Sequence, residues 1–234
     1  MLLTLQLCLY LTMKLNSIPK IGEVYDTFKE YFNSNKDKIG TEDIVKNLYE
    51  YSQYYVAIAL QKEEDKTLKS VFKEITKLRM DTSYPFLLAI YGDYKKELIT
   101  FDEFVEILNQ TKNYVFRRAI CGIPTNSLNK TFATLYKNIK SENYADSVKA
   151  TFMLMDGYRR FPDDAEFTRE IQLKDVYSFR SRNYLLESLE NFKRKELVNA
   201  ENYTIEHIIP QNPKTPIEWQ QELGENWKLV KEKY

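Results

Sequence analysis

Apolar residues recur every three or four positions along most of this chain, and this spacing is the feature that most restricts its fold. In one segment the apolar side chains fall at Ile44, Leu48, Tyr51, Tyr55 and Ile58, which places them on one face of an α-helix. Only six of the 234 residues are glycine, and sparse glycine fits long helices with few tight turns. We therefore predict an all-α fold whose body contains about ten helices.

Capping residues predict several of the helix boundaries. Thr100 and Glu103 have the form of a capping box. In this motif the side chain of each residue accepts a hydrogen bond from the backbone N–H of the other residue. The helix that they open is expected to end near Gly122. Further helix starts are expected at Thr41, Asn126, Asp163 and Thr215, the last followed by Pro216 at the first helical position. The last long helix of the body is expected over residues 182–195.

The N-terminal segment MLLTLQLCLYLTMKL admits two interpretations. Leucines at alternate positions favour a strand, whereas the leucine-rich composition favours a helix. The segment has no positive n-region or small-residue cleavage site, so it does not predict an export signal. It is also too short to span a bilayer. It is either an element docked on the core or the cut edge of a longer protein.

Composition excludes several classes of protein. Lys+Arg and Asp+Glu number 34 each, which argues against a uniformly basic surface but leaves a local basic groove open. With two distant cysteines and one histidine, neither a disulfide framework nor a structural zinc site is expected. Free thiols fit a cytoplasmic protein. The sequence contains no G-x-x-x-x-G-K-[ST] or G-x-G-x-x-G stretch, so nucleotide binding by those loops has no support.

The stretch YTIEHIIPQN, residues 203–212, breaks the helical pattern near the end of the chain. Its β-branched residues, closed by Pro210, predict a short strand. The strand carries Glu206 and His207, the only histidine. Histidine can act as a general base near neutral pH, and a carboxylate can bind a hard cation such as Mg²⁺. The alternative is an ordinary strand with a structural histidine.

Three arginine groups lie beside aromatic residues: Arg117 with Arg118, Arg159 with Arg160, and Arg180 with Arg182. Guanidinium groups suit phosphate because they donate in a planar fork. Arginine interleaved with aromatic residues is compatible with binding a nucleic-acid backbone. The alternative is that these arginines form salt bridges at helix ends or extend along apolar surface.

At these residues the chain resembles a known family. The stretch NYLLESLENFKRKELVNAENYTIEHIIPQNP, followed by EW, is similar to the C-terminal region of GmrSD-type, modification-dependent restriction endonucleases, which end in an HNH (His-Me finger) nuclease domain. The upstream pieces LTMKLNSIPKIGEVYDTFKEY, YVFRRAICGIPTNSLNKTFATL, YRRFPDDAEF and KDVYSFRSRNYLL resemble the helical region that precedes this motif. The resemblance therefore extends over nearly the whole chain.

The resemblance implies a metal-dependent DNA endonuclease of a phage-defence system. His207 would activate water for attack on a phosphodiester, and Glu206 would bind the divalent cation, Mg²⁺ in the complete site. The substrate would be double-stranded DNA, base-modified as in the family. The helical body would help to hold DNA or couple to a partner, and from the pattern of arginines beside aromatic residues we expect the DNA contacts at Arg117, Arg118, Arg180 and Arg182. A partner would be the family's N-terminal ParB-like NTPase domain, whose D-G-Q-Q-R motif is missing from this chain.

The sequence departs from the family after His207. The family's G-N-L-T-L-like strand and its metal-binding helix have no counterpart here. We therefore expect a helical domain over residues 1–198 and an incomplete ββα segment of the HNH motif over 199–234. Such a truncated fragment would be inactive alone, without its cation. The alternative function is a non-enzymatic helical module that binds DNA or a protein.

Overall fold

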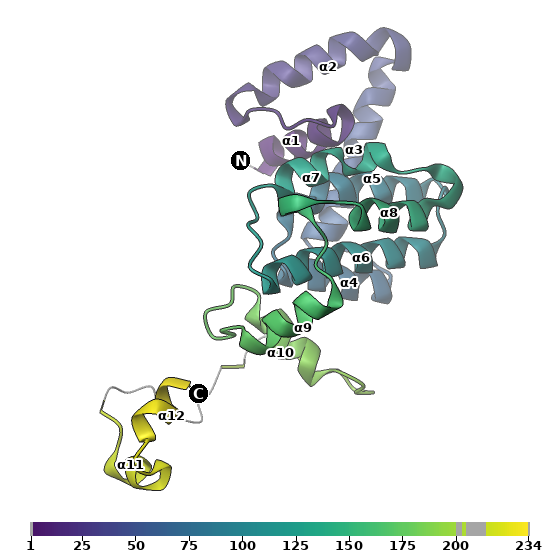
Figure 1. Cartoon of the computed structure of the whole chain (residues 1–234). Helices are drawn as coiled ribbons and strands as arrows, with labels where there is room; N and C mark the ends of the chain where they lie inside the picture. Colours follow the sequence, from purple (N-terminus) through teal and green to yellow (C-terminus); the bar gives the residue numbers. More distant parts are fainter. Residues whose placement is uncertain (1, 200–202, 205–213, 234) are drawn as a thin grey trace. The chain divides into compact units, whose positions relative to one another are not determined.

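The computed structural model describes residues 2–199, 203–204 and 214–233. The chain divides into two compact units, Met1–Tyr184 and Leu185–Tyr234 (Figure 1). Every regular element in the described residues is helical, and twelve of these elements are α-helices. The structure thus confirms the predicted all-α fold. The predicted boundary between residues 198 and 199 stays a prediction.

Unit 1 contains nine complete α-helices joined by short turns, several of them 3₁₀ helices. The α-helices are α1 (Leu2–Leu15), α2 (Val24–Ile39), α3 (Thr41–Ala59), α4 (Lys66–Lys77), α5 (Tyr84–Lys95), α6 (Phe101–Ile120), α7 (Leu128–Leu135), α8 (Tyr144–Met153) and α9 (Asp164–Leu173). The 3₁₀ helices are η1 (Ile21–Glu23), η2 (Asp81–Ser83), η3 (Tyr136–Asn138), η4 (Ser141–Asn143) and η5 (Gly157–Arg159). Helix α10 (Arg182–Glu190) begins in unit 1 and ends in unit 2.

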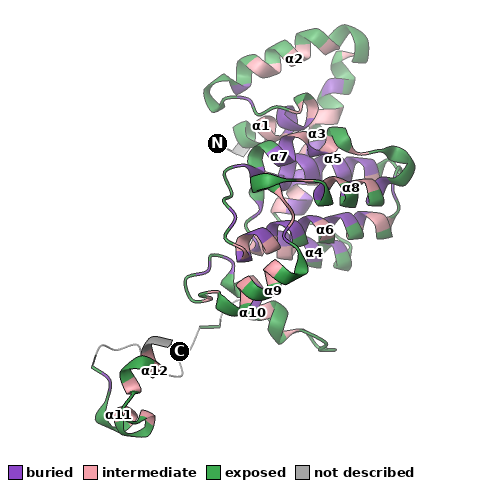
Figure 2. Cartoon of the chain, viewed as in Figure 1, coloured by how far each residue is buried: buried purple, intermediate pink, exposed green. Residues whose placement is uncertain are grey.

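Helix α5 forms the centre of unit 1. All its residues from Tyr84 to Asp93 are buried, and it packs against α1, α3, α6 and α7. Figure 2 shows the buried residues concentrated in these central helices, while α2 is mostly exposed. Gly92 permits the close approach of α3, because a Cβ at this position would lie 2.5 Å from the hydroxyl oxygen of Tyr51. This core holds α6, and therefore its two arginines, in place.

The N-terminal segment is the helix α1, so the strand interpretation of its alternating leucines is wrong. Tyr10, Leu11 and Met13 are buried, and α1 packs against α2, α3 and α5. Leu3 and Leu5 remain exposed. The segment therefore docks on the core through one helical face, which the period-two pattern does not reveal.

The Thr100 capping box is confirmed, whereas the predicted cap at Thr41 and the predicted helix end at residue 195 are wrong. Thr100 accepts from the backbone N–H of Glu103, whose carboxylate accepts from Thr100. Thr41 does not cap α3. The cap position is Gly40, whose φ of 94° favours glycine. The helix expected to reach residue 195 ends at Glu190, and Lys193 has a left-handed φ of 60° that no α-helix continues.

Unit 2 contains the rest of α10, together with α11 (Ile217–Leu223) and α12 (Trp227–Lys233). Helix α11 begins one residue later than expected, because Pro216 is its cap residue with an extended ψ of 147°. The Thr215 hydroxyl instead accepts from the Lys231 ammonium at 2.7 Å. Gly224 ends α11. The expected strand of residues 204–210 lies outside the described residues, apart from Thr204.

Candidate functional site

The three arginine groups of the sequence converge around the C-terminal half of α6. Arg117 and Arg118 lie in its last turn. The backbone of residues 158–160 contacts Arg118. Arg180 lines a hollow together with Ile120 at the end of α6. Long-range packing therefore brings together residues that are separated by up to about 60 positions in the sequence.

Arg118 is buried, with 1% of its surface exposed. Its guanidinium donates to the carbonyl oxygens of Tyr158 (2.8 Å), Pro124 (2.9 Å) and Arg160 (3.4 Å), and to the Ser127 hydroxyl (3.4 Å). Burial lowers the pKa of this guanidinium, which nevertheless stays charged at neutral pH. Arg118 thus joins α6 to the loops that follow α6 and α8.

Arg117 is half-buried and also engaged within unit 1. Its Nε donates to the Asn113 side chain at 3.1 Å and its Nη1 to the Pro162 carbonyl at 3.2 Å. Its Nη2 forms an ion pair with Asp164 at the start of α9. The guanidinium lies 4.9 Å from the centre of the Phe167 ring. Arg117 therefore fixes α9 against α6.

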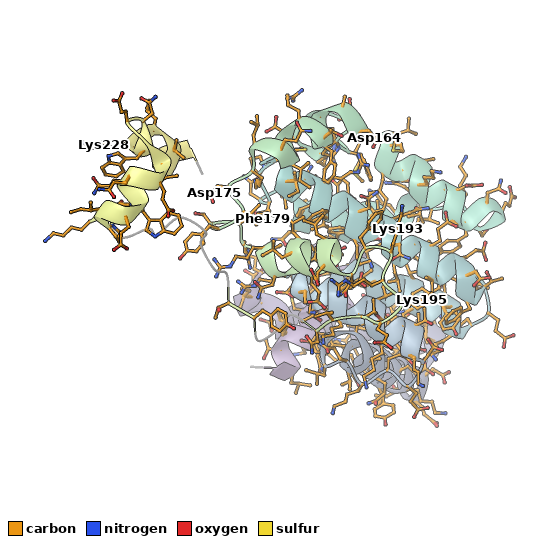
Figure 3. All side chains as sticks on the ribbon, turned by 90° about the horizontal axis from the view of Figure 1, so that it is seen from below. Asp164, Asp175, Phe179, Lys193, Lys195 and Lys228 are labelled. Carbon is orange, nitrogen blue, oxygen red and sulfur yellow. The ribbon has the colours of Figure 1, made fainter. Side chains whose placement is uncertain are left out.

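Arg180 and Arg182 are both exposed. Arg182 donates to the Tyr177 carbonyl at 2.6 Å and lies over the Tyr177 ring. Arg180 has no hydrogen bond or ion pair within the part of the chain that the structure describes. Arg180 lines a hollow of about 390 Å³ with Asp175 and Phe179, which are labelled in Figure 3. Of the four arginines predicted to bind DNA, these two are open to a ligand.

Lys174 is a site residue that sequence reasoning did not find. Its ammonium donates to the carbonyl oxygens of Ala119 and Ile120 at 3.0 Å each, so it satisfies the free carbonyls at the end of α6. It also lies 5.1 Å from the centre of the Phe179 ring. No local pattern predicts a contact across 54 and 55 positions, which only the fold creates.

The described residues offer neither an activated thiol nor a metal cluster. Cys8 and Cys121 are free and half-buried. Burial, followed by the nearby Glu166 and Glu170, raises the pKa of Cys121, so its thiol stays protonated near neutral pH. Among residues 2–199, 203–204 and 214–233, no three His, Cys, Asp or Glu side chains lie close enough together to hold a metal ion.

Glu206 and His207 lie outside the described residues. Their predicted roles, and the DNA-binding roles of Arg117, Arg118, Arg180 and Arg182, stay predictions. No helix in the described part of the chain has the length and apolar character needed to cross a membrane.

Residues 161–231 match the family described as GmrSD restriction endonucleases, C-terminal domain. This match confirms the resemblance found in the sequence for the region from Phe161 in unit 1 to Lys231 in unit 2, and it includes the stretch YTIEHIIPQN. No curated protein and no solved structure matches the chain.

Proposed function

We propose that this chain supplies the helical region and part of the HNH motif of a metal-dependent endonuclease that cleaves base-modified DNA in phage defence. The match of residues 161–231 to the C-terminal domain of GmrSD restriction endonucleases is the observation that carries this proposal. The matched region contains Glu206 and His207 as well as Arg180 and Arg182. We place this activity in the cytoplasm, where the protein would encounter phage DNA.

His207 is the general base of the proposed reaction. Its imidazole takes a proton from the water that attacks the phosphodiester, and it is the only histidine able to do so. Glu206 would help to hold a divalent cation, which when bound stabilises negative charge on the phosphate and the leaving oxygen. No cluster of three metal-binding side chains is found among the described residues, and Glu206 and His207 lie outside them.

Arg180 and Arg182 are the proposed contacts to the DNA backbone in unit 1. Both are exposed, and Arg180 has no partner within the described residues. Arg117 and Arg118 act on DNA indirectly, because their donors hold the loops around α6. Arg180 and Arg182 are thus proposed to contact the DNA directly, whereas Arg117 and Arg118 position the loops around α6.

Cleavage is proposed to need a segment that this sequence does not contain. No G-N-L-T-L-like stretch follows His207. The test compares the chain itself with a fusion that adds the corresponding segment of a GmrSD endonuclease. The substrates are DNA with unmodified cytosine and DNA with 5-methylcytosine or 5-hydroxymethylcytosine, each with Mg²⁺ or EDTA. We expect Mg²⁺-dependent cleavage of modified DNA by the fusion alone.

His207→Ala in the fusion is the decisive variant, and Lys38→Ala on α2 is its control. Loss of cleavage in His207→Ala but not in Lys38→Ala supports the proposal. A fusion that cleaves none of the substrates contradicts it. DNA binding without cleavage by every version would favour the alternative, a non-enzymatic DNA-binding module, and lack of DNA binding would favour a protein partner.

A further inference from the structure

Lys14, in the last turn of α1, is half-buried, and its ammonium lies over two tyrosine rings. It lies 5.3 Å from the centre of the Tyr10 ring, one turn earlier on α1, and 4.9 Å from the centre of the Tyr51 ring on α3. Both tyrosines belong to the hydrophobic core. Lys14 forms no hydrogen bond or ion pair within the described residues. Its cation is therefore partly removed from water without a paired carboxylate.

The charged groups around Lys14 do not supply that partner. Asp93 on α5 attracts the ammonium, but its carboxylate already accepts from two tyrosine hydroxyls, one on η3 and one on α8. Glu50 on α3 also attracts the ammonium, but it is exposed and water screens its charge. Lys96, directly after α5, carries a like charge that disfavours the ammonium form. The surroundings of Lys14 thus favour loss of its proton.

Burial and then Lys96 lower the pKa of Lys14 to about 8. An ordinary lysine has a pKa of about 10.4, so the neutral fraction of Lys14 at pH 8 is larger by a factor on the order of 100. Only a neutral amine has the lone pair that attacks an electrophile. A less basic amine is also a weaker nucleophile, as is found for thiols, and this offsets part of the gain.

Two other lysines share only part of this environment. Lys95 also lies over two tyrosine rings, at 5.2 and 5.4 Å from their centres, but it is exposed. Lys112 is buried, but its ammonium forms an ion pair with Glu74. Among these three lysines, Lys14 combines partial burial with the lack of an anionic partner in the described part of the chain. Lys95 and Lys112 therefore serve as internal comparisons.

We propose that Lys14 is an acylation site whose amine takes an acyl group from a small acyl phosphate. A small reagent is required because Lys14 is only partly open to solvent. An acyl phosphate is favoured because Lys95 and Lys96 are exposed beside the site, and their charges attract its phosphate group. The inference goes beyond the proposed function and does not rest on it, because these residues lie in unit 1 and take no part in cleavage.

The reaction is an acyl transfer from oxygen to nitrogen. The neutral amine of Lys14 attacks the carbonyl carbon and forms a C–N bond. The C–O bond to phosphate breaks, and its electron pair leaves with the phosphate. A proton on the nitrogen passes to solvent. The product is an uncharged amide, so acylation removes a cation that is costly to bury.

The test treats the full, folded chain with limiting acetyl phosphate at pH 8. The chain is then unfolded, and the remaining amines are acetylated with deuterated acetic anhydride, so that mass spectrometry gives the extent of reaction at each lysine. We expect Lys14 to react about 3- to 10-fold faster than Lys38, an exposed lysine on α2, after the partial offset of its larger neutral fraction. Lys95 should react like Lys38, and Lys112 more slowly. In concentrated urea the preference for Lys14 should vanish.

The pH profile separates activation of the amine from mere accessibility. The rate at Lys14 should level off above about pH 8–9, where its amine is already neutral, whereas the rate at Lys38 should keep rising toward the ordinary lysine pKa of about 10.4. Lys14 reacting no faster than Lys38 at pH 8, or the two rates rising in parallel up to pH 10, overturns the proposal, whatever the cleavage assays show.

Lys96→Gln tests the charge beside the site, and Lys38→Gln is its matched control at another exposed lysine. Removing the Lys96 ammonium should raise the pH at which the Lys14 rate levels off and should slow the reaction with acetyl phosphate at pH 8. Lys38→Gln should change neither. The uncharged ester p-nitrophenyl acetate should lose less of its rate in Lys96→Gln, because it carries no phosphate. Equal effects of the two variants contradict the choice of an acyl phosphate as the donor.

Discussion

The Nη1 atom of Arg118 donates to the backbone carbonyl oxygen of Tyr158 at 2.8 Å, across 40 positions of the sequence. A second donor of the same guanidinium reaches the Pro124 carbonyl at 2.9 Å. One buried side chain thus joins three segments of unit 1. The charge is stabilised by several oxygen acceptors, so the arrangement depends on all of them being present.

Replacing Arg118 with methionine should destabilise unit 1 strongly. The substitution leaves the carbonyl oxygens of Tyr158 and Pro124 without their donors, and we expect the free energy of unfolding to fall by about 2–4 kcal/mol. Arg118→Lys should restore only part of this loss, because one ammonium cannot reproduce the planar fork. Urea denaturation measures the change.

Arg182→Met is the matched control for Arg118→Met. Arg182 is exposed, and exposed substitutions usually change stability by less than about 0.5 kcal/mol. If the two methionine variants lose the same stability, the buried arginine does not have the structural role assigned to it.

The inward position of Arg118 could have been predicted from the phase of α6. Ile107, Thr111, Tyr114 and Arg118 follow the helical spacing, and all four are buried. Arg117 precedes Arg118 by one position, which rotates its side chain by about 100° around the helix axis. Arg117 is therefore only half-buried. The two arginines therefore lie on different sides of α6 and do not form one basic pair. The Tyr158 and Arg160 carbonyls that Arg118 contacts lie 40 and 42 positions away in the sequence, so only the fold identifies these two partners.

Removing the Thr100 hydroxyl should cost about 1 kcal/mol of stability, as is usual for an N-cap residue. Thr100 accepts from the N–H of Glu103 at 3.2 Å and closes the capping box. Thr41→Ala is a sharp control because Thr41 is the first residue of α3 and its side chain does not cap the helix. Thermal or urea unfolding should show a loss in Thr100→Ala and nearly none in Thr41→Ala. A reversed order would contradict the two cap assignments.

Thr100 and Thr41 show which helix boundaries can be predicted from the sequence. The capping box of Thr100 joins two residues that are only three positions apart, so the local sequence determines where this helix begins. The start of α3 depends on the backbone of Gly40, whose positive φ moves the cap position to the glycine. The candidate site follows the same division: the arginine groups are visible in the sequence, while Lys174 is found only through its tertiary contacts with the end of α6.

Lys14 should make stability depend on pH in the alkaline range. Burial and then the nearby Lys96 lower the pKa of Lys14 to about 8, against the opposing effect of Glu50 and Asp93. Between pH 8 and 10.5 the unfolded chain therefore holds more protons at this residue than the folded chain, so stability rises with pH. The rise should be on the order of 1 kcal/mol after solvent screening.

Lys14→Met tests this dependence, because methionine cannot titrate. The unfolding free energy of the unchanged chain minus that of Lys14→Met should increase from pH 7.5 to pH 9.5. The rings of Tyr10 and Tyr51 lie 5.3 and 4.9 Å from the ammonium and favour its charged form. A difference that stays constant with pH would show that these rings offset the effect of burial.

The exposed arginines should control the salt dependence of DNA binding. Each phosphate contact contributes about 0.9 to the slope of log K against log salt concentration for duplex DNA. Arg180 and Arg182 are exposed, so Arg180→Ala and Arg182→Ala should each reduce the slope by about this amount. Lys38→Ala, at an exposed position of α2, should leave it unchanged. Fluorescence anisotropy between 50 and 200 mM salt measures all three slopes. Equal slopes for the unchanged chain and both arginine variants would remove these arginines from the DNA contact, because a lost phosphate contact must release fewer counterions.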